Sequence, residues 1–352
     1  MADPSSPADH DQVPGVDLDA LRAWMDGEDL GDGPLEHVEQ LAGGTQNVLV
    51  RFERAGRAYV LRRPPLHKRA NSDETMRREA RVLAALAGSD VPHPGLIAAC
   101  GDVDVLGAAF YLMEPIDGFN PASGLPEPHR SDAAMRRELG FGMVDGIAAL
   151  ARVDHVAVGL GDFGKPDGWL ERQVGRWRSQ LDSYAEHEGY PGPDIPGVDR
   201  VSAWLDDHRP DGWRPGIIHG DFHLANVLVR PDAPQLAAIV DWELCTIGDP
   251  LLDLGHLLAT WPDPDAPGGG AVGAGIPDLP TGDELVDRYV DATGRARDDV
   301  AWFHVLAAYR LGIILEGTHA RAFAGKAPKE VGDLLHATTV GLFERALAVV
   351  EG

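Results

Sequence analysis

The chain has 352 residues, of which 44% are hydrophobic and 25% charged, and its formal net charge is −25. This length and composition exclude a disordered or fibrous chain and allow two globular domains. The acidic excess argues against a nucleic-acid partner, because the phosphates of a nucleic acid would be repelled.

The N-terminal residues 1–15 are rich in Pro, Ser and Asp and are expected to form a disordered tail. They have neither a basic region nor an apolar core, so they do not resemble a signal peptide. The two cysteines, Cys100 and Cys245, are too few for a disulfide framework. No uninterrupted apolar run approaches the roughly 18 residues of a membrane span. The sequence therefore predicts a cytoplasmic protein without a membrane partner.

Residues 16–115 are expected to form a small N-terminal α+β lobe with a leading helix. Apolar residues recur at helical spacing after Asp17 and again after Ser72, and each of these residues can act as an N-cap. Alternating residues bounded by glycine turns indicate strands. The predicted elements are a helix at 17–25, strands within 35–63, a helix at 72–88 and two strands within 103–113.

Residues 116–352 are expected to form a larger, mainly helical C-terminal lobe. Helical spacing of apolar residues predicts helices at 131–151, 168–184, 199–208, 283–293, 298–323 and 328–350. The strand-like exception is the stretch 216–243. The fold class expected from both halves is α+β with two lobes, an antiparallel-sheet lobe followed by a helical one.

The stretch 216–243 contains the most informative polar residues of the chain. Asp221 lies in a loop after an apolar strand, Asn226 follows five residues later, and Asp241 follows a short hairpin. This spacing is typical of phosphoryl transfer, in which one carboxylate accepts the proton of the attacking hydroxyl. We expect Asp221 to be that base, and Asn226 and Asp241 to hold Mg²⁺ on nucleotide phosphates. The alternatives are a turn cap for Asp221 and an ordinary turn residue for Asn226.

The histidines of this stretch allow a second interpretation. His219 is expected to brace the loop through hydrogen bonds. With Asp221 and His223 it spells H-x-D-x-H, which is compatible with a zinc hydrolase. No other compact His, Asp or Cys cluster in the sequence completes such a site, so phosphoryl transfer is preferred. Glu243 is expected to reach the cation through water or to lie on the surface.

The N-terminal lobe offers candidate nucleotide-binding residues. The turn Gly43-Gly44-Thr45 presents backbone N–H groups that can cover phosphates. Arg62 ends a strand and Glu79 lies on the following helix. A strand cation paired with a helix carboxylate would grip the α- and β-phosphates. The alternative for Arg62 and Glu79 is a surface ion pair.

A connecting strand from Tyr111 to Ile116 is expected to lead into the second lobe. Backbone groups of Glu114 and Ile116 are the candidates for binding an adenine edge. The string D-F-G at 162–164 matches a kinase metal-binding motif but precedes Asp221, whereas the metal-binding Asp must follow the catalytic loop. We therefore interpret this string as an ordinary loop.

These residues together resemble the aminoglycoside phosphotransferase superfamily, the small-molecule branch of the protein-kinase-like fold. The resemblance spans roughly residues 35–325. It is carried by H-G-D-F-H-L-A-N (219–226), I-V-D-W-E (239–243) and G-D-P-L-L-D-L-G (248–255). The last string contains Asp249, which we expect to support the site together with His219. Within the superfamily, the branch of kinase-like domains fused to some acyl-CoA dehydrogenases is most similar, through segments 60–65, 158–166, 170–177 and 309–317.

The resemblance implies a two-lobed kinase-like fold, the use of Mg²⁺ and ATP, and transfer of the γ-phosphoryl group to a hydroxyl of a small molecule. GTP is not excluded. The likeness to the dehydrogenase-fused branch favours a hydroxyacyl-CoA or a related metabolite as acceptor. An alternative acceptor is an aminoglycoside or another antibiotic, since the acidic chain would attract a cationic substrate. An alternative function is that of a pseudokinase, which only binds nucleotide.

Two departures from the wider kinase pattern are visible. Arg62 stands where kinases usually carry Lys, and a planar guanidinium does not simply replace an ammonium group. The dehydrogenase-fused branch itself has Arg at this position. Arg62 is therefore interpreted as a feature of that branch and not as a loss of activity. The glycine turn is also shorter than G-x-G-x-x-G. A protein kinase is disfavoured because no A-P-E motif follows Asp241. The acceptor and the oligomeric state stay open.

Overall fold

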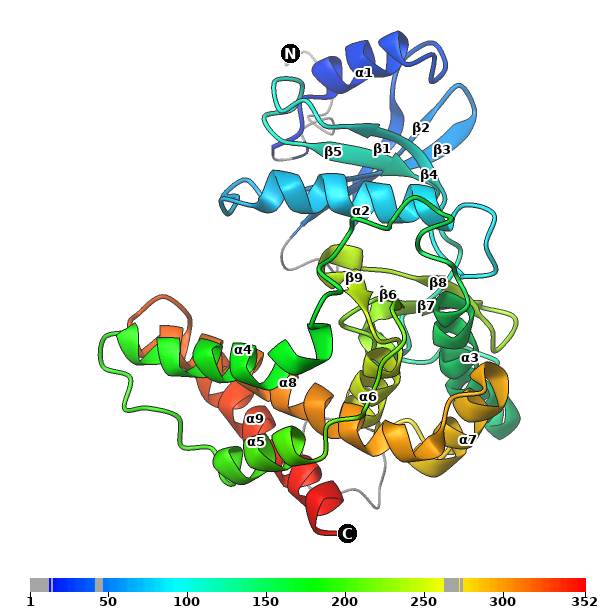
Figure 1. Ribbon diagram of the computed structural model, residues 1–352. Helices are drawn as coiled ribbons and strands as arrows, with labels where there is room; N and C mark the ends of the chain where they lie inside the picture. The colour runs from blue at the N-terminus through cyan, green and yellow to red at the C-terminus, as the bar shows by residue number, and fades with distance from the viewer. Residues whose placement is uncertain (1–12, 14, 42–46, 263–271, 273–274) are drawn as a thin grey trace, which may run out of the picture. The chain divides into compact units, whose positions relative to one another are not determined.

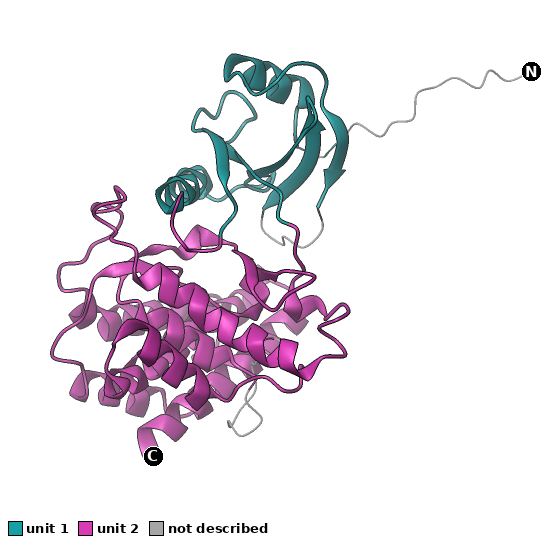
Figure 2. Cartoon of the chain, turned by 90° about the vertical axis from the view of Figure 1, so that its right-hand side faces the viewer, with its two compact units in different colours: residues 1–87, 93–116 teal, residues 88–92, 117–352 magenta. Residues whose placement is uncertain are grey.

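The computed structural model describes residues 13, 15–41, 47–262, 272 and 275–352. The chain divides into two compact units, which Figure 2 colours separately. Unit 1 comprises Met1–Ala87 and His93–Ile116, and unit 2 comprises Gly88–Pro92 and Asp117–Gly352. The predicted turn Gly43-Gly44-Thr45 and residues 1–12 of the expected tail lie outside the described residues.

Unit 1 is built on a five-stranded antiparallel sheet in the order β1-β2-β3-β5-β4. The strands are β1 (Glu36–Gln40), β2 (Val48–Arg54), β3 (Arg57–Arg63), β4 (Leu96–Cys100) and β5 (Phe110–Met113). The prediction of two strands within 103–113 was half wrong. Residues 103–106 form a turn, Gly107 takes a left-handed φ of +72°, and the partner of β5 is the earlier strand β4.

Helices lie on both faces of this sheet: α1 (Leu18–Gly27) on one and α2 (Ser72–Leu86) on the other (Figure 1). Side chains of β3 alternate between these faces. Leu61 is fully buried in an apolar cluster with Leu21 and Met25 of α1, whereas Arg62 turns to the face that α2 covers. The sheet thereby places a cation against α2.

The two helix starts in unit 1 differ from each other. The prediction for α1 is confirmed, because the Asp17 carboxylate accepts the Ala20 backbone N–H at 2.9 Å. The prediction that Ser72 caps α2 was wrong. Asn71 occupies the cap position without a capping side-chain bond, and the Ser72 hydroxyl instead accepts the Arg69 backbone N–H. A Ser beside the first turn bonds the preceding loop as readily as the helix.

Unit 2 is mainly helical, which confirms the expected class. Its helices are α3 (Ala133–Ala151), α4 (Trp169–Ser183), α5 (Val198–Asp207), α6 (Leu251–Thr260), α7 (Gly282–Thr293), α8 (Arg297–Phe323) and α9 (Lys329–Glu351). Short 3₁₀ helices lie at Pro121–Ser123, Tyr184–Glu186, Leu224–Asn226 and Trp242–Leu244.

Helix α6 is the one that the sequence analysis missed. All ten of its residues are buried, so no alternation of apolar and polar faces marks it as a helix. In Figure 1 it lies in the middle of the helices of unit 2. A Cβ at Gly255 would come within 2.3 Å of the Phe303 carbonyl oxygen of α8, so the two backbones pack directly together.

Helix α8 passes a length and composition test for a membrane-crossing helix. Its most apolar 18-residue window has a mean hydropathy of 1.3, and 72% of that window is buried inside the protein. Sequence inspection did not register this window, because charged and polar residues interrupt every long apolar run. A central core helix has these same properties.

Two short two-stranded sheets in unit 2 carry the motif residues. Strand β6 (Gly216–Ile218) pairs with β9 (Thr246–Gly248), and β7 (Val227–Val229) pairs with β8 (Leu236–Ile239), both antiparallel. Val227 and Ile239 are cross-strand partners. The residue before β7 and the residues after β8 therefore lie at the same end of the β7–β8 hairpin.

Candidate active site

Asn226 and Asp241 lie at that shared end of the β7–β8 hairpin. The Val240 backbone N–H donates to the Asn226 carbonyl at 2.9 Å, which joins the two segments. Asp241 has a φ of +68°. This left-handed conformation is costly for a residue with a side chain and tends to occur where function requires it. Asp241 and Glu243 each offer a carboxylate oxygen, and these atoms lie within 4.8 Å of each other.

Asn226 also contacts Asp221 directly. Its Nδ2 donates to the Asp221 carboxylate at 3.0 Å and to the Asp221 carbonyl at 2.8 Å. With the nitrogen committed to Asp221, the amide oxygen is the atom that remains for a cation. Amide and carboxylate oxygens are the hard ligands that Mg²⁺ prefers, so this donor set fits the ion.

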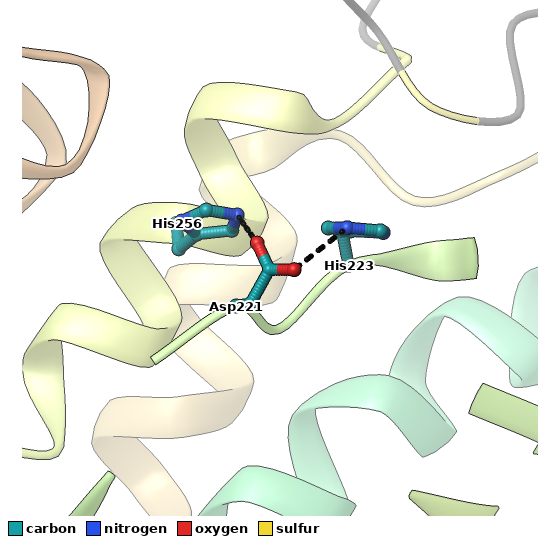
Figure 3. Close-up of side chains that lie close together, drawn as sticks. All are labelled: Asp221, His223 and His256. Carbon is teal, nitrogen blue, oxygen red and sulfur yellow. Dashed lines mark ion pairs between the residues drawn. The ribbon is translucent and has the colours of Figure 1, made fainter. Parts of the chain in front are cut away.

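The Asp221 carboxylate lies between two imidazoles, as Figure 3 shows. His256 Nε2, from α6, is 3.2 Å from one carboxylate oxygen, and His223 Nε2 is 3.6 Å from the other. Burial alone would raise the pKa of Asp221, but its interactions with His223 and His256 outweigh burial and hold the pKa well below its usual range. The side chain keeps 31% exposure. Asp221 is therefore an ionised, accessible hydrogen-bond acceptor at neutral pH.

The peptide group of Gly220 is held from two sides by buried charged residues. Its N–H donates to the Asp253 carboxylate at 2.8 Å, and its carbonyl accepts from Arg310 Nη1 at 2.6 Å. Gly220 has a φ of +84°, and a Cβ there would come within 2.5 Å of the Leu244 carbonyl oxygen. Only glycine suits this position. The backbone that carries Asp221 is thus positioned by α6 and α8.

His219 is fully buried beside the same loop. Its Nε2 lies 2.9 Å from the Val240 carbonyl, and its Nδ1 accepts the Asp221 backbone N–H at 3.3 Å. These partners suit a neutral imidazole with the proton on Nε2. Burial lowers the pKa of His219 to about 4, which agrees with a neutral ring. His219 therefore connects the Asp221 loop to the segment that leads to Asp241.

Asp253 is a buried carboxylate that accepts two backbone N–H groups, from His219 at 2.7 Å and from Gly220. Burial raises its pKa to about 6, although these hydrogen bonds and the nearby Arg310 act in the opposite direction. Burial likewise lowers the pKa of Arg310, against the attraction of Asp221 and Asp253. The hydrogen bonds of these two buried charged residues therefore go to the backbone of the loop that carries Asp221.

Asp249 lies at the start of α6 and forms a buried bidentate pair with Arg295. The Nη1–Oδ1 and Nη2–Oδ2 distances are 2.8 and 3.0 Å. The same carboxylate accepts the backbone N–H groups of Arg214 and Leu251, each at 3.0 Å. Asp249 thus anchors the first turn of the helix that supplies Asp253 and His256, without contacting Asp221 itself.

Acid sensitivity of folding is expected from two histidines, the buried His219 and the half-buried His304. Burial lowers the pKa of both His219 and His304 to about 4. The unfolded chain takes up these protons near pH 6.5, while the folded chain resists them until about pH 4. The free energy of unfolding should therefore be intact above pH 6.5 and fall between pH 6.5 and 4, by up to about 3 kcal/mol for each group.

Urea unfolding followed at pH 7.5 and pH 5 measures this loss. His304→Gln removes one titrating group and should show a smaller fall. His208→Gln changes an exposed histidine that follows α5, and this variant should behave like the unmodified chain. If the free energy of unfolding fell equally in the His304→Gln variant, the lowered pKa of His304 in the folded chain would be contradicted.

In unit 1, Arg62 and Glu79 form the predicted strand–helix pair. Arg62 Nε is 2.9 Å from Glu79 Oε2, and Nη2 donates to Oε1 at 3.3 Å. Tyr111, the cross-strand neighbour of Arg62, donates its hydroxyl to Glu79 Oε2 at 2.8 Å. Glu79 is 1% exposed and Arg62 is 8% exposed, so the alternative of a surface ion pair is excluded.

The segment after β5 does not continue as a strand beyond Met113. The Glu114 backbone N–H donates to the Gly95 carbonyl at 2.8 Å, and the Glu114 side chain is exposed. The Glu114 carbonyl and the Ile116 backbone are therefore the groups left as candidates for an adenine edge. Their role stays a prediction.

The structure adds one residue that sequence inspection did not connect with the H-x-D-x-H string. His256 joins Asp221 and His223, and one ligand atom from each lies within 4.8 Å of the others. The statement that no further residue completes such a cluster was wrong, because α6 was not recognised. Tyr111, Asp253 and Arg310 were missed as well. The repeated aspartate in D-P-L-L-D was the available signal for Asp253.

The family model described as "Phosphotransferase enzyme family" (APH) matches residues 37–303. Among curated proteins, the chain is 31% identical over 303 residues to acyl-CoA dehydrogenase family member 11 of Gallus gallus. It is 30% identical over 326 residues to family member 10 of Mus musculus. These matches cover 83% and 89% of this chain but only 38% and 29% of the relatives. The chain thus spans well under half the length of these relatives.

Solved structures agree with this assignment. A crystal structure from Ralstonia eutropha JMP134, described as a candidate aminoglycoside phosphotransferase, has a TM-score of 0.78 and 31% identity, with 96% of this chain and 98% of that chain covered. The GDP complex of wild-type aminoglycoside 2′-phosphotransferase-IIIa has a TM-score of 0.59 and 17% identity, with 90% and 97% covered, and so supports the fold alone. The chain belongs to the phosphotransferase enzyme family.

Proposed function

We propose that the protein is a kinase of small molecules that transfers the γ-phosphoryl group of ATP to a substrate hydroxyl with the help of Mg²⁺. The observation that carries this proposal is the contact between Asp221 and Asn226 at the foot of the hairpin that leads to Asp241. One loop thereby presents a proton acceptor beside a set of cation ligands, which is the arrangement phosphoryl transfer needs.

In this mechanism Asp221 orients the acceptor hydroxyl and accepts its proton late in the transfer. Its depressed pKa makes it a weak base, which suits a loose transition state in which little proton removal is needed early. Asn226 and Asp241 would hold Mg²⁺, which would neutralise charge on the phosphates. His219, Asp253 and Arg310 keep the loop backbone in position.

Nucleotide use is supported by members of the same fold. Structures of a thermostable variant of aminoglycoside phosphotransferase APH(4)-Ia contain ADP or AMP-PNP with hygromycin B, at TM-scores of 0.57. The 2′-phosphotransferase-IIIa structure contains GDP, so GTP stays an alternative donor. We propose that Arg62, oriented by Glu79 and Tyr111, binds the α- and β-phosphates and that backbone groups of Glu114 and Ile116 bind the base.

For the acceptor, we propose a hydroxyacyl-CoA or a related acyl metabolite in the cytoplasm. The support is the similarity to proteins named as acyl-CoA dehydrogenase family members 10 and 11, in which this chain matches only a part. An aminoglycoside is the second candidate, favoured by the solved structures and by the net charge of −25. No nucleic acid or membrane partner is proposed.

A transfer assay distinguishes these acceptors. γ-Phosphate transfer from Mg²⁺-ATP would be measured across 3- and 4-hydroxyacyl-CoAs, aminoglycosides, choline, homoserine and sugars, with Asp221→Asn as control. A phosphorylated hydroxyacyl-CoA formed only by the unmodified chain would support the proposal. Transfer only to an aminoglycoside would replace the acceptor, and no transfer despite Mg²⁺-dependent ATP binding would favour a pseudokinase.

Cation binding by Asp241 is tested separately from catalysis. Mg²⁺ should tighten ATP binding to the unmodified chain, and Asp241→Ala should reduce that effect by at least about tenfold, because a direct ligand is lost. Isothermal titration with and without Mg²⁺ measures it. Asp29→Ala is the matched control, since Asp29 is also left-handed, with φ +55°, but lies on the surface of unit 1. Retention of the full Mg²⁺ effect by Asp241→Ala would refute the metal-ligand role.

A further inference from the structure

A second cluster of potential metal ligands lies in unit 2, at the helical hairpin of α8 and α9. Glu316 and His319 are three residues apart on α8 and therefore share one face of the helix. His336 reaches them from α9. One carboxylate oxygen and one nitrogen from each ring lie within 4.8 Å of one another. The phosphotransfer mechanism uses none of these residues.

Glu316 is a carboxylate with no exposed surface. Its Oε1 accepts the Tyr190 hydroxyl at 2.6 Å, and its Oε2 lies 2.7 Å from His336 Nδ1. A buried carboxylate needs a compensating positive charge. Within the described part of the chain, the ion-pair partner recorded for Glu316 is His336, which is cationic only when protonated.

His319 has no hydrogen-bond partner for its buried Nδ1 among the described residues. The nearest carboxylate, Asp333, is 3.8 Å away, which is too far for a hydrogen bond. The ring of His319 stacks on that of His336, with centroids 4.4 Å apart and planes at 19°. His319 therefore offers a ring nitrogen beside the Glu316 carboxylate.

We propose that Glu316, His319 and His336 bind a divalent transition-metal ion of the zinc type. Two imidazole nitrogens and one carboxylate oxygen match the ligand preference of Zn²⁺ and not that of Mg²⁺, which favours oxygen. Tetrahedral Zn²⁺ places its ligand atoms about 3.3 Å apart, given bonds of about 2.0–2.1 Å. The three ligand atoms lie within 4.8 Å of one another, so binding would require side-chain adjustment to that spacing.

The surroundings of the cluster support this assignment. Tyr190 orients Glu316 in the way that outer hydrogen bonds orient metal ligands. Asp333 is half-exposed beside His319 and ion-paired with Lys329. It could supply a fourth oxygen, or water could take that position. The ion would replace the missing positive charge and join α8, α9 and the segment of Tyr190. The cluster lies six residues along α8 from Arg310, roughly 9 Å of helix rise from the residue that holds Gly220.

Zinc binding to the full chain tests the proposal. After removal of metal by EDTA, isothermal titration with ZnCl₂ would be compared between the unmodified chain and His319→Gln. This variant removes one ligand but leaves the Glu316 bonds to Tyr190 and His336 in place. His208→Gln, at an exposed position directly after α5, is the matched control. Zinc binding at Asp221, His223 and His256 would be common to all three proteins and would cancel in the difference.

The expected result is one further zinc equivalent in the unmodified chain and in His208→Gln, with at least about tenfold weaker binding at that site in His319→Gln. Zinc should also raise the melting temperature of the first two proteins more than that of the third. Equal stoichiometry and affinity in all three, or no binding in any, would overturn the proposal. The cluster would then be only a set of hydrogen bonds that join Glu316 to Tyr190 and His336.

Discussion

Asp221→Asn is expected to lower the turnover of phosphoryl transfer by about 10²–10⁴-fold while leaving Mg²⁺-ATP binding nearly unchanged. The amide has the shape of the carboxylate but cannot accept the proton of the acceptor hydroxyl. It also loses the negative charge that interacts with His223 and His256. The effect should therefore appear in kcat and not in the affinity for nucleotide.

Steady-state kinetics with the acceptor identified in the panel measures this change, and nucleotide titration measures binding. Asp232→Asn is the matched control. It makes the same chemical change at an exposed position between β7 and β8, where the carboxylate contacts only Arg230 among its recorded ion pairs in the described chain. Asp232→Asn should retain full turnover. Unchanged turnover in Asp221→Asn would refute its assignment as the base.

Arg295→Met is expected to destabilise unit 2 by about 3–5 kcal/mol. The substitution leaves Asp249, which is 0% exposed, as a buried charge supported only by two backbone N–H groups. The loss would be transmitted to the first turn of α6, so turnover should fall together with stability. Urea unfolding followed by tryptophan fluorescence measures this, because every tryptophan except Trp24 lies in unit 2.

Arg288→Met is the matched control for burial. Arg288 and Asp145 form a bidentate pair with N–O distances of 2.8 Å, but their side chains are 48% and 49% exposed. Such a pair contributes about 0–1 kcal/mol, because water already solvates both groups. Replacing both Asp249 and Arg295 with apolar residues should recover part of the loss. If Arg288→Met and Arg295→Met lowered the free energy of unfolding by similar amounts, burial would not explain the effect of Arg295→Met.

The residues of the proposed catalytic loop could be predicted from the sequence because their arrangement is local. Asp221 and Asn226 are five residues apart in one loop, and a two-stranded hairpin returns the chain to Asp241. Strand ends, glycine turns and short hairpins are specified by residues that are close together in the sequence. The pairing of Arg62 with Glu79 was predicted for a related reason, since the order of strand and helix restricts which residues can meet.

The residues that support this loop were not accessible in the same way. Gly220 bonds Asp253 across 33 positions and Arg310 across 90 positions. His256 and Asp253 lie on α6, which is buried on every side and therefore lacks the apolar and polar periodicity of a surface helix. The strand β4 was missed for a related reason, since its pairing with β5 depends on contacts across the sheet.

The sequence by itself determined the class of the fold, the family, and the order of Asp221, Asn226 and Asp241 along one loop and hairpin. These features depend on residues close together in the chain. Only the tertiary structure decided that Asp221 lies between His223 and His256, that the Gly220 peptide is held by Asp253 and Arg310, and that Glu316, His319 and His336 converge. The physical reason is that packing brings together buried polar groups from distant helices, each of which needs a partner that no local pattern specifies.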